Sequence, residues 1–460
     1  MEIRTDIVKE TIVDGILYVF DDEAYEIPSA IVTTAVTTIY VPENSVDAYK
    51  EINDDYKEMI YPYSYSGVRL TKEPFYDNVA VIMTSGSNAP MMNVMYTKGL
   101  AAHQDYMTLA EAKAITASQM GTFRYNEDIT SFKEFKYFTN VTEIVQNCFF
   151  DVPNLEEIEL PLSVKRIGRA AFGISTAKQN AGWKSKLKHI TGCKNVEYCS
   201  VNAFQYMNEL ISVDLSQKLK TISTSFNGCP KLESCGDLSG VEFFDDVNGA
   251  AAGLFVNCDS LKSIYMPKFS IVPIIAFRGC KSLTNLTLDW DNITSIGRSA
   301  FGYNNDVDLN RYIPIEYVPS MPKLTTLVDA ANFQDNYNIK YVGDMPLVTI
   351  IPSSCFNRCY NILSIGRLDN VEEVVKWGFA GLNKLEYIYL PKCTKVGQEA
   401  FTIFTSMEEV NRTIEFGKPY EEITFNEIAF KDCKNTIIIC NGVELTAEQY
   451  QAVGAQKPEA

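Results

Sequence analysis

Histidine is scarce in this sequence: the 460 residues contain only two, His103 and His189. They lie far apart, and His189 falls at an expected solvent-facing strand position, which favours a surface imidazole over a catalytic base. The sequence also lacks a G-x-S-x-G nucleophile motif, phosphate-binding glycine loops and an H-E-x-x-H zinc motif. We therefore predict no enzymatic activity, no catalytic residue and no cofactor.

Basic residues are outnumbered, with 41 Lys and Arg against 58 Asp and Glu and a formal net charge of −17. No basic stripe is present to displace counterions from a phosphate backbone, so we expect no nucleic-acid partner. No run of about 18 apolar residues appears either, which argues against membrane insertion. The first ten residues, M-E-I-R-T-D-I-V-K-E, do not resemble a secretory signal. We therefore expect either that a signal was removed or that the protein does not reach its place of work by export.

A phenylalanine recurs through most of the chain. The spacings between successive members are 23, 32, 22, 29, 22, 24, 32, 23, 23, 22 and 29 residues. Self-similarity at roughly 20 to 29 residues is typical of a leucine-rich solenoid, in which each turn needs its neighbours to bury its apolar face. The twelve structural anchors are Phe149, Phe172, Phe204, Phe226, Phe255, Phe277, Phe301, Phe333, Phe356, Phe379, Phe401 and Phe430.

Two extended pieces are predicted in each turn. A Leu-x-x-Ile-x-Leu phrase such as Leu385-Ile388-Leu390 alternates with period two, as a half-buried strand requires. A following Val or Ile, such as Val396, begins a second piece that brings the phenylalanine into the core. Two spacings of 32 residues come from insertions just after a phenylalanine, at 173–186 and 302–322.

Five of the twelve cysteines follow an anchor phenylalanine by three residues, at a position that other turns fill with apolar side chains. There a cysteine behaves as a small buried hydrophobe, so we expect free thiols suited to a reducing compartment. The close pair Cys355 and Cys359 encloses an anchor phenylalanine, which favours core packing, and we expect no metal site. The five are Cys229, Cys258, Cys280, Cys359 and Cys433.

The phrases I-G-R-S-A-F, C-K-S-L and L-E-E-I-E-L-P resemble the BspA-like, or Treponema-type, leucine-rich repeats. The resemblance covers about residues 129 to 443. The resemblance implies a mostly β horseshoe that functions at a surface or in adhesion and has no catalytic activity. The stretch M-Y-T-K-G-L-A-A-H-Q-D-Y-M-T-L-A-E-A and the segment after it resemble a junction in repeat proteins of gut Bacteroidales and their bacteriophages.

The predicted fold is α/β but mainly β: a leucine-rich-repeat solenoid of about twelve turns, preceded by a small non-repeat N-terminal module. Residues 1–60 form that module, with a strand ending at Pro42 and a helix carrying Tyr49. Residues 61–128 are a linker and capping region, with a helix near 108–119 that begins at a Thr108/Glu111 capping box. Residues 129–443 are the solenoid, and 444–460 a C-terminal capping helix and tail.

Outward strand positions supply the candidate binding surface. Exposed tyrosines beside acids suit protein or glycan contact, because aromatic faces give a large contact area at low entropic cost. Ordinary cross-strand pairing explains each residue singly, so only a cluster would indicate a site. The candidates are Tyr265, Tyr341, Tyr387, Tyr389, Glu157 and Glu159 on strands, with Trp183 and Tyr312 in the insertions.

These observations favour a non-enzymatic structural or adhesion protein, and most specifically a component of a bacteriophage virion, in the tail or its fibres. The expected partners are other virion proteins or a protein or glycan of the host surface, and a homo-oligomer is possible. One alternative is a secreted or cell-surface adhesin of a gut bacterium. A second is a glycan-acting enzyme that uses paired carboxylates on a solenoid scaffold.

Overall fold

The computed structural model describes residues 10–13, 16–19, 38–42, 46–63, 81–245, 253–302, 313–404 and 410–458. The chain divides into two compact units. The first comprises Met1–Gly121, Glu127–Thr142 and Asn154–Ser163, and the second Thr122–Asn126, Glu143–Pro153 and Val164–Ala460. Among the described residues, no helix is long and apolar enough to cross a membrane.

The first unit begins with a four-stranded sheet in the order β1-β2-β3-β4. β1 (Glu10–Val13) and β2 (Ile16–Val19) pair antiparallel, and residues 14 and 15 between them lie outside the described residues. β2, β3 (Thr38–Pro42) and β4 (Ile60–Tyr63) pair in parallel at offsets of 22 and then 21 residues. The predicted helix is α1 (Val46–Ile52), which buries Tyr49, and η2 (Asp54–Met59) follows it.

The rest of the first unit corrects one prediction. In place of one helix near 108–119 there are α4 (Leu109–Ala114) and α5 (Ala117–Met120), because Ile115 is extended and Thr116 opens a second capping box with Gln119. The predicted Thr108/Glu111 capping box is present. The remaining elements are β5 (Val81–Thr84), α3 (Ser85–Thr97), β6 (Tyr106–Thr108), β7 (Ser131–Phe132), η3 (Lys133–Tyr137) and β9 (Glu157–Glu159).

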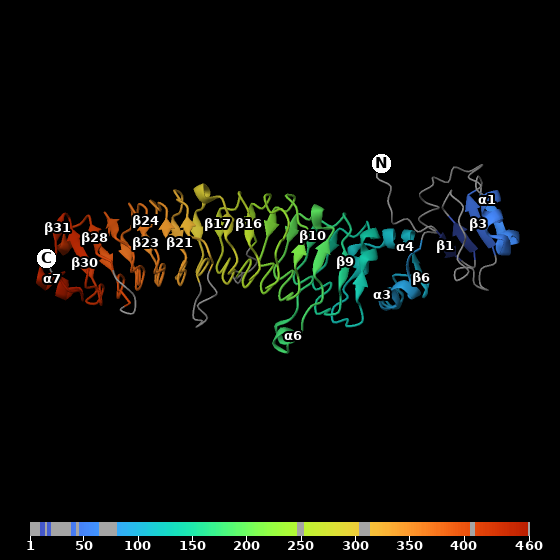
Figure 1. The fold of residues 1–460 in the computed structure, drawn as a ribbon, viewed down its shortest axis with the longest axis horizontal. Helices are drawn as coiled ribbons and strands as arrows, with labels where there is room; N and C mark the ends of the chain where they lie inside the picture. The colour runs from blue at the N-terminus through green and yellow to red at the C-terminus, as the bar shows by residue number, and fades with distance from the viewer. Residues whose placement is uncertain are drawn as a thin grey trace. The chain divides into compact units, whose positions relative to one another are not determined.

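The second unit is a solenoid of parallel strands that follow one another from green to red in Figure 1. The first strand row corresponds to the Leu-x-x-Ile-x-Leu phrases. Its members in this unit are β11 (His189–Thr191), β13 (Ser212–Val213), β16 (Ser263–Tyr265), β18 (Asn285–Thr287), β20 (Tyr317–Val318), β22 (Tyr341–Val342), β24 (Ser364–Ile365), β26 (Tyr387–Leu390), β28 (Arg412–Phe416) and β30 (Thr436–Cys440).

The second strand row contains one strand before each anchor phenylalanine, which confirms twelve turns. Its members are β8 (Glu143–Ile144), β10 (Arg166–Ile167), β12 (Tyr198–Cys199), β14 (Thr221–Ile222), β15 (Phe243–Phe244), β17 (Ile271–Val272), β19 (Ser295–Ile296), β21 (Thr326–Leu327), β23 (Ile350–Ile351), β25 (Glu373–Val374), β27 (Lys395–Val396) and β29 (Thr424–Phe425). Short helices α6 (Thr176–Asn180), η4 (Cys193–Asn195), η5 (Trp290–Asn292) and η6 (Tyr420–Glu422) lie in the connections.

The anchor phenylalanines form a continuous stack in the core. Successive rings lie 4.9 to 6.1 Å apart between centroids and are close to parallel, within the range of offset aromatic stacking. Each anchor N–H donates to the carbonyl that precedes the next anchor, as from Phe277 to Ala300 at 3.0 Å. Phe123, which is not one of the predicted anchors, adds a further ring, 5.3 Å from that of Phe149 between centroids.

The backbone just before most anchor phenylalanines adopts a left-handed conformation. In most turns the residue two before the phenylalanine has positive φ, including Asn147, Asn202, Ile275 and Trp377 at 58°, 58°, 48° and 58°. This left-handed conformation turns the chain sharply enough to point the ring inward. All twelve cysteines are buried free thiols, as predicted. The five cysteines at the repeat position each donate a hydrogen bond from the thiol to the backbone carbonyl of the anchor phenylalanine one turn earlier.

A short strand and a short helix cover the last turn of the solenoid. After β30, β31 (Val443–Glu444) pairs back antiparallel, and α7 (Ala447–Ala452) begins at the Thr446/Gln449 capping box. The helix end supplies the acceptor that the last turn lacks, because Phe430 N–H donates to the Val453 carbonyl at 3.0 Å. Tyr450 is fully buried and its hydroxyl accepts from Ile438 N–H at 2.9 Å.

Candidate interaction surfaces

Strand alternation in the first row places tyrosines outward on adjacent turns. Tyr317 on β20 and Tyr341 on β22 are paired in register, while Val318 and Val342 beside them are buried. The two tyrosines are 59% and 45% exposed. A salt bridge from Lys340 to Glu316 at 2.9 Å joins the same two turns. Two aromatic side chains therefore lie side by side on a rigid parallel sheet.

A second pair of tyrosines lies on β26. Tyr387 and Tyr389 are 51% and 45% exposed, and the intervening Ile388 is buried. The Tyr387 hydroxyl donates to Glu415 on β28 at 2.7 Å. Partial burial, followed by the hydrogen bond and charge of Glu415, raises the pKa of Tyr387 to about 12. This phenol therefore remains a neutral hydrogen-bond donor at physiological pH.

We define the tyrosine face as Tyr317, Tyr341, Tyr387 and Tyr389. The order of the turns is β20, β22, β24 and β26, with the exposed Ser364 of β24 paired in register with Tyr341. Strands about 4.8 Å apart put β20 and β26 roughly 14 Å apart across this serine gap. Tyr317 is not among the residues predicted from the sequence, because the 302–322 insertion hides its register with Tyr341.

The other predicted residues that the structure describes do not join this cluster. Tyr265 is 58% exposed on β16, but it belongs to a separate two-stranded sheet with β18. Tyr312 lies outside the described residues. Trp183 is half-buried in the 173–186 insertion, with the Lys178 ammonium 3.1 Å from its ring centroid.

Glu157 and Glu159 lie on β9 in the first unit. Glu157 accepts a hydrogen bond from Ser131 at 3.3 Å, and Glu159 forms a salt bridge with Lys136 at 3.2 Å. These contacts are ordinary cross-strand and adjacent-turn pairing. We therefore leave the two carboxylates outside the tyrosine face.

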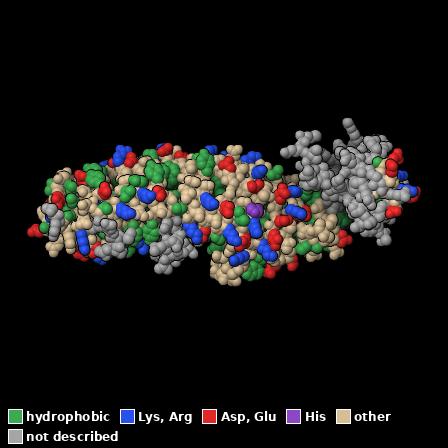
Figure 2. Space-filling model, viewed as in Figure 1, with side chains coloured by type: hydrophobic (Ala, Val, Ile, Leu, Met, Phe, Trp, Pro, Cys, Tyr) green, Lys and Arg blue, Asp and Glu red, His purple; other side chains and the backbone are tan. Residues whose placement is uncertain are grey.

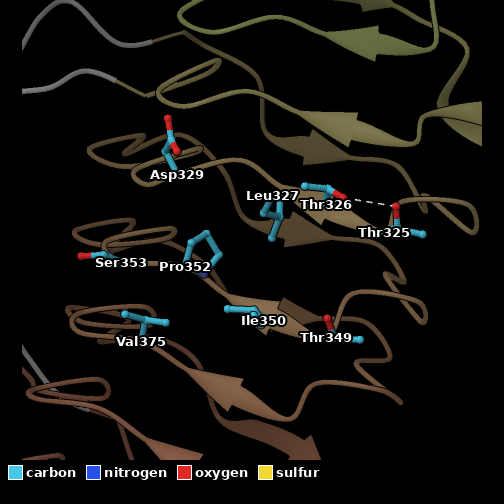
Figure 3. A pocket seen from close by; sticks show the side chains of 9 residues that line it. All are labelled: Thr325, Thr326, Leu327, Asp329, Thr349, Ile350, Pro352, Ser353 and Val375. Carbon is cyan, nitrogen blue, oxygen red and sulfur yellow. Dashed lines mark hydrogen bonds between the residues drawn. The ribbon is translucent and has the colours of Figure 1, made fainter.

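A pocket of about 440 Å³ lies on the second strand row, between β21 and β23 (Figure 3). Hydroxyl and aliphatic groups dominate its walls, and the one carboxylate, Asp329, lies at one end. It is lined by Thr325, Thr326, Leu327, Asp329, Thr349, Ile350, Pro352, Ser353 and Val375. This composition could hold a small polar molecule, but it offers no pairing of nucleophile and base.

His189 is exposed on β11, as predicted, and its Nδ1 lies 2.8 Å from the Ser212 hydroxyl on the adjacent turn. Hydrogen bonding across an open strand row explains this contact. Within the part of the chain that the structure describes, no group of three His, Cys, Asp or Glu residues could hold a metal ion.

A parallel solenoid with repeating turns of about 23 residues is the architecture of leucine-rich-repeat proteins. The chain belongs to the BspA type leucine rich repeat region family, whose model matches residues 118–247, 232–316 and 326–449 in six copies. Among curated proteins, no sequence matches the chain.

Three solved structures are similar to the chain at low identity. A leucine-rich cell surface protein from Faecalibacterium prausnitzii A2-165 is 17% identical, with a TM-score of 0.34, covering 69% of this chain and 87% of that one. A leucine-rich repeat protein from Bacteroides ovatus ATCC 8483 is 17% identical, with a TM-score of 0.34 and coverages of 72% and 87%. The pneumococcal vaccine antigen PcpA is 14% identical, with a TM-score of 0.33 and coverages of 66% and 72%.

Proposed function

We propose that the protein is a non-enzymatic adhesion protein whose tyrosine face contacts a protein or glycan on a host cell surface. The observation that carries this proposal is the clustering of four exposed tyrosines on three nearby strands. A single exposed tyrosine is ordinary on a sheet, but a group of them offers a contact area that water covers poorly. Tyrosine is also among the residue types most enriched at the centres of binding interfaces.

Rigidity supports the same proposal. Each tyrosine sits next to a buried aliphatic residue of its own strand, and these turns also contain the continuous phenylalanine stack of the core. A side chain on such a framework loses little freedom on binding. The Tyr387–Glu415 hydrogen bond fixes one phenol further and leaves the other Glu415 oxygen as an acceptor for a hydroxyl or amide of the partner.

Substitution of the face tests the proposal. A labelled full-length protein carrying Tyr317→Ser, Tyr341→Ser and Tyr389→Ser should bind candidate host bacteria at least about tenfold more weakly than the parent, by flow cytometry. The matched control is Tyr265→Ser, which removes an equally exposed tyrosine from the same row but a different sheet. Equal binding by the parent and the triple variant would rule out this face.

We propose that the protein is a component of a bacteriophage virion, located in the tail or its fibres. The twelve buried free thiols support this location, because such a protein folds in the reducing host cytoplasm and acts outside the cell afterwards. Detection by mass spectrometry in purified virions is the expected result. Its presence on bacterial cells in the absence of phage would favour the cell-surface adhesin instead.

We further propose that the module at residues 1–60 anchors the protein to other virion proteins. Its described part is a small sheet with its own buried residues, Ile39, Val41 and Tyr49. Removal of residues 1–60 should leave the protein out of purified particles while its far-UV circular dichroism remains dominated by β structure. Incorporation of the shortened protein would place the anchor elsewhere.

A further inference from the structure

The second strand row is interrupted at the pocket between β21 and β23. The sheet β17-β19-β21 ends there, and a separate sheet, β23-β25-β27-β29, begins. Within these sheets, the residue after each paired strand donates its N–H to the preceding turn, as from Val375 to the Ile351 carbonyl at 2.9 Å. Pro352 holds that position after β23, and proline has no N–H. The Leu327 carbonyl of β21 therefore lacks the donor that other turns supply.

Two N–H groups on the other side of this interruption are also unused. In the next turn, Glu372 N–H donates to the Thr349 carbonyl at 2.8 Å. In the part of the chain that the structure describes, no corresponding bond runs from Thr349 or Ile350 to the Thr325 carbonyl. We call residues 325–327 and 349–352 the ladder gap. Its two carbonyl oxygens and two N–H groups have no hydrogen-bond partner among the described residues, so they require water or a ligand.

The two turns that border the ladder gap are held together on either side of it. In the first strand row, Tyr317 and Tyr341 of the same two turns are paired in register. Just after the gap, Ala331 N–H donates to the Ser353 carbonyl at 2.9 Å. An inserted peptide strand would have to move β21 and β23 to about twice the usual spacing of roughly 4.8 Å, which these contacts prevent. The gap therefore admits a small molecule rather than an extended chain.

Hydroxyl groups surround the ladder gap. Thr325 and Thr349 lie at one end of the pocket, and Asp329 and Ser353 lie at the other (Figure 3). The Thr326 hydroxyl lies 3.3 Å from that of Thr325. The pocket volume of about 440 Å³ is within the range typical of small-molecule sites. Its size and lining suit a compact ligand with several hydrogen-bonding groups.

The charge of the pocket favours a neutral ligand. No Lys, Arg or His is among the lining residues, so nothing there compensates an anion. Asp329 is exposed, and within the described residues no salt bridge engages it. Its negative charge repels an acidic ligand, whereas a single exposed carboxylate contributes little to binding a cation.

We infer that the ladder gap is a second binding site and that it takes a neutral sugar unit. A sugar hydroxyl both donates and accepts, so neighbouring hydroxyls match carbonyl oxygens on β21 and N–H groups at β23. The aliphatic side chains of Ile350 and Pro352 offer an apolar surface to the C–H groups of the ring. The inference goes beyond the proposed host-surface contact, because none of these residues belongs to the tyrosine face.

The test is saturation-transfer difference NMR on the full-length protein with the methyl glycosides of glucose, galactose, mannose and N-acetylglucosamine. Methyl glucuronide serves as the charged counterpart of the glucose compound. We expect transfer to at least one neutral glycoside and weaker transfer to the glucuronide. Absence of transfer to all four neutral glycosides, or stronger transfer to the glucuronide than to any of them, would overturn the inference.

Paired threonine substitutions locate the binding. Thr326→Val and Thr349→Val together should weaken binding of the preferred glycoside at least about fivefold, since each neutral hydrogen bond contributes a factor of roughly 2 to 10. The matched control carries Thr394→Val and Thr424→Val, which alter exposed threonines at the same two register positions of turns whose ladder is complete. The control should bind like the parent protein, and equal loss in both double variants would contradict a site at the ladder gap.

Pro352→Val tests the role of the open ladder itself. This substitution removes no hydroxyl but restores an N–H where Val375 has one in the next turn. The new donor should engage the Leu327 carbonyl and weaken glycoside binding, while the far-UV circular dichroism stays that of the parent protein. Undiminished binding by Pro352→Val would show that the unpaired backbone groups take no part, and would overturn the assignment of the ladder gap as the site.

Discussion

The Cys280 thiol donates a hydrogen bond to the carbonyl oxygen of Phe255, on the preceding turn, at 3.0 Å. Phe255 O also accepts from Cys258 N–H within its own turn. The thiol therefore links two turns at the point where the backbone ladder leaves a lone pair free. Five cysteines occupy this position, which is why they recur at the repeat spacing without forming disulfides.

The phenylalanine stack should dominate stability. Phe277 is fully buried between Phe255 and Phe301, at 6.1 and 5.7 Å between ring centroids. Phe277→Ala should lower the free energy of unfolding by about 3 to 5 kcal/mol, because it removes a ring and leaves a cavity. Tyr265→Ala, at an exposed strand position, should change it by less than about 0.5 kcal/mol. Urea unfolding of both variants checks this, and similar effects would contradict the packing role of the stack.

The buried thiols should make the protein sensitive to alkali. Burial raises the pKa of Cys199 to about 12 and that of Cys280 well above its ordinary range. An unfolded thiol ionises near pH 8.5, so stability is constant below that pH and falls as the pH rises through the interval up to the folded-state pKa.

Melting temperatures measured between pH 7 and 10 test this dependence. Each buried thiol adds a slope of about 1.4 kcal/mol per pH unit once the unfolded thiol is ionised. A Cys280→Ala variant should therefore lose stability at neutral pH but show a shallower alkaline decline. An unchanged slope would mean that Cys280 ionises equally in the folded and unfolded states.

Backbone strain at Ile275 offers a stabilising substitution. Its φ of 48° lies in the left-handed region, which a β-branched residue adopts at a cost of roughly 1 to 2 kcal/mol. Asn147 and Asn202 occupy the same position in other turns. Ile275→Asn should therefore raise the free energy of unfolding by about 0.5 to 1 kcal/mol, whereas Ile271→Asn, on an exposed strand position of the same turn, should not. If both substitutions lowered the free energy of unfolding, the contacts of the Ile275 side chain would outweigh the cost of its left-handed φ.

The C-terminal cap depends on one buried phenol. Tyr450→Phe removes the oxygen that accepts from Ile438 N–H and leaves that donor unsatisfied inside the cap, at a cost of about 1 to 3 kcal/mol. In this variant, backbone amides of β30 and α7 should exchange hydrogen faster than in the parent protein, whereas amides in turns far from the C-terminal end should be unaffected. A uniform change along the chain would argue against a separate capping role.

The solenoid could be predicted from the sequence because all twelve anchors are phenylalanines and each packs into the core at the same point of its turn. Every predicted phenylalanine lies in the stack, because the repeat brings it to the same inward position in each turn. Phe123 escaped detection because it lacks the flanking phrase of the other anchors, although it lies 26 residues before Phe149. The break between α4 and α5 was also missed, because a capping box at Thr116 overrides a helical pattern that otherwise continues.

The candidate site was less predictable, because it depends on which turns become neighbours. Alternation placed Tyr341, Tyr387 and Tyr389 outward, but the register of Tyr317 with Tyr341 crosses an insertion whose length hides it. Conversely, Tyr265 has the same local pattern and lies in a different sheet. Local sequence determines the direction of each side chain, and only the assembled turns determine which side chains form a cluster.

Tyrosine nitration in the presence and absence of the host cells tests the central claim most directly. In the free protein, Tyr265, Tyr317, Tyr341 and Tyr389 should all react with tetranitromethane, because each is at least 45% exposed. On binding, Tyr317, Tyr341 and Tyr389 should be protected while Tyr265 remains reactive, as peptide mass spectrometry would show. Protection of Tyr265 alone, or undiminished nitration of Tyr317, Tyr341 and Tyr389 in cell-bound protein, would contradict the assignment of the tyrosine face as the binding surface.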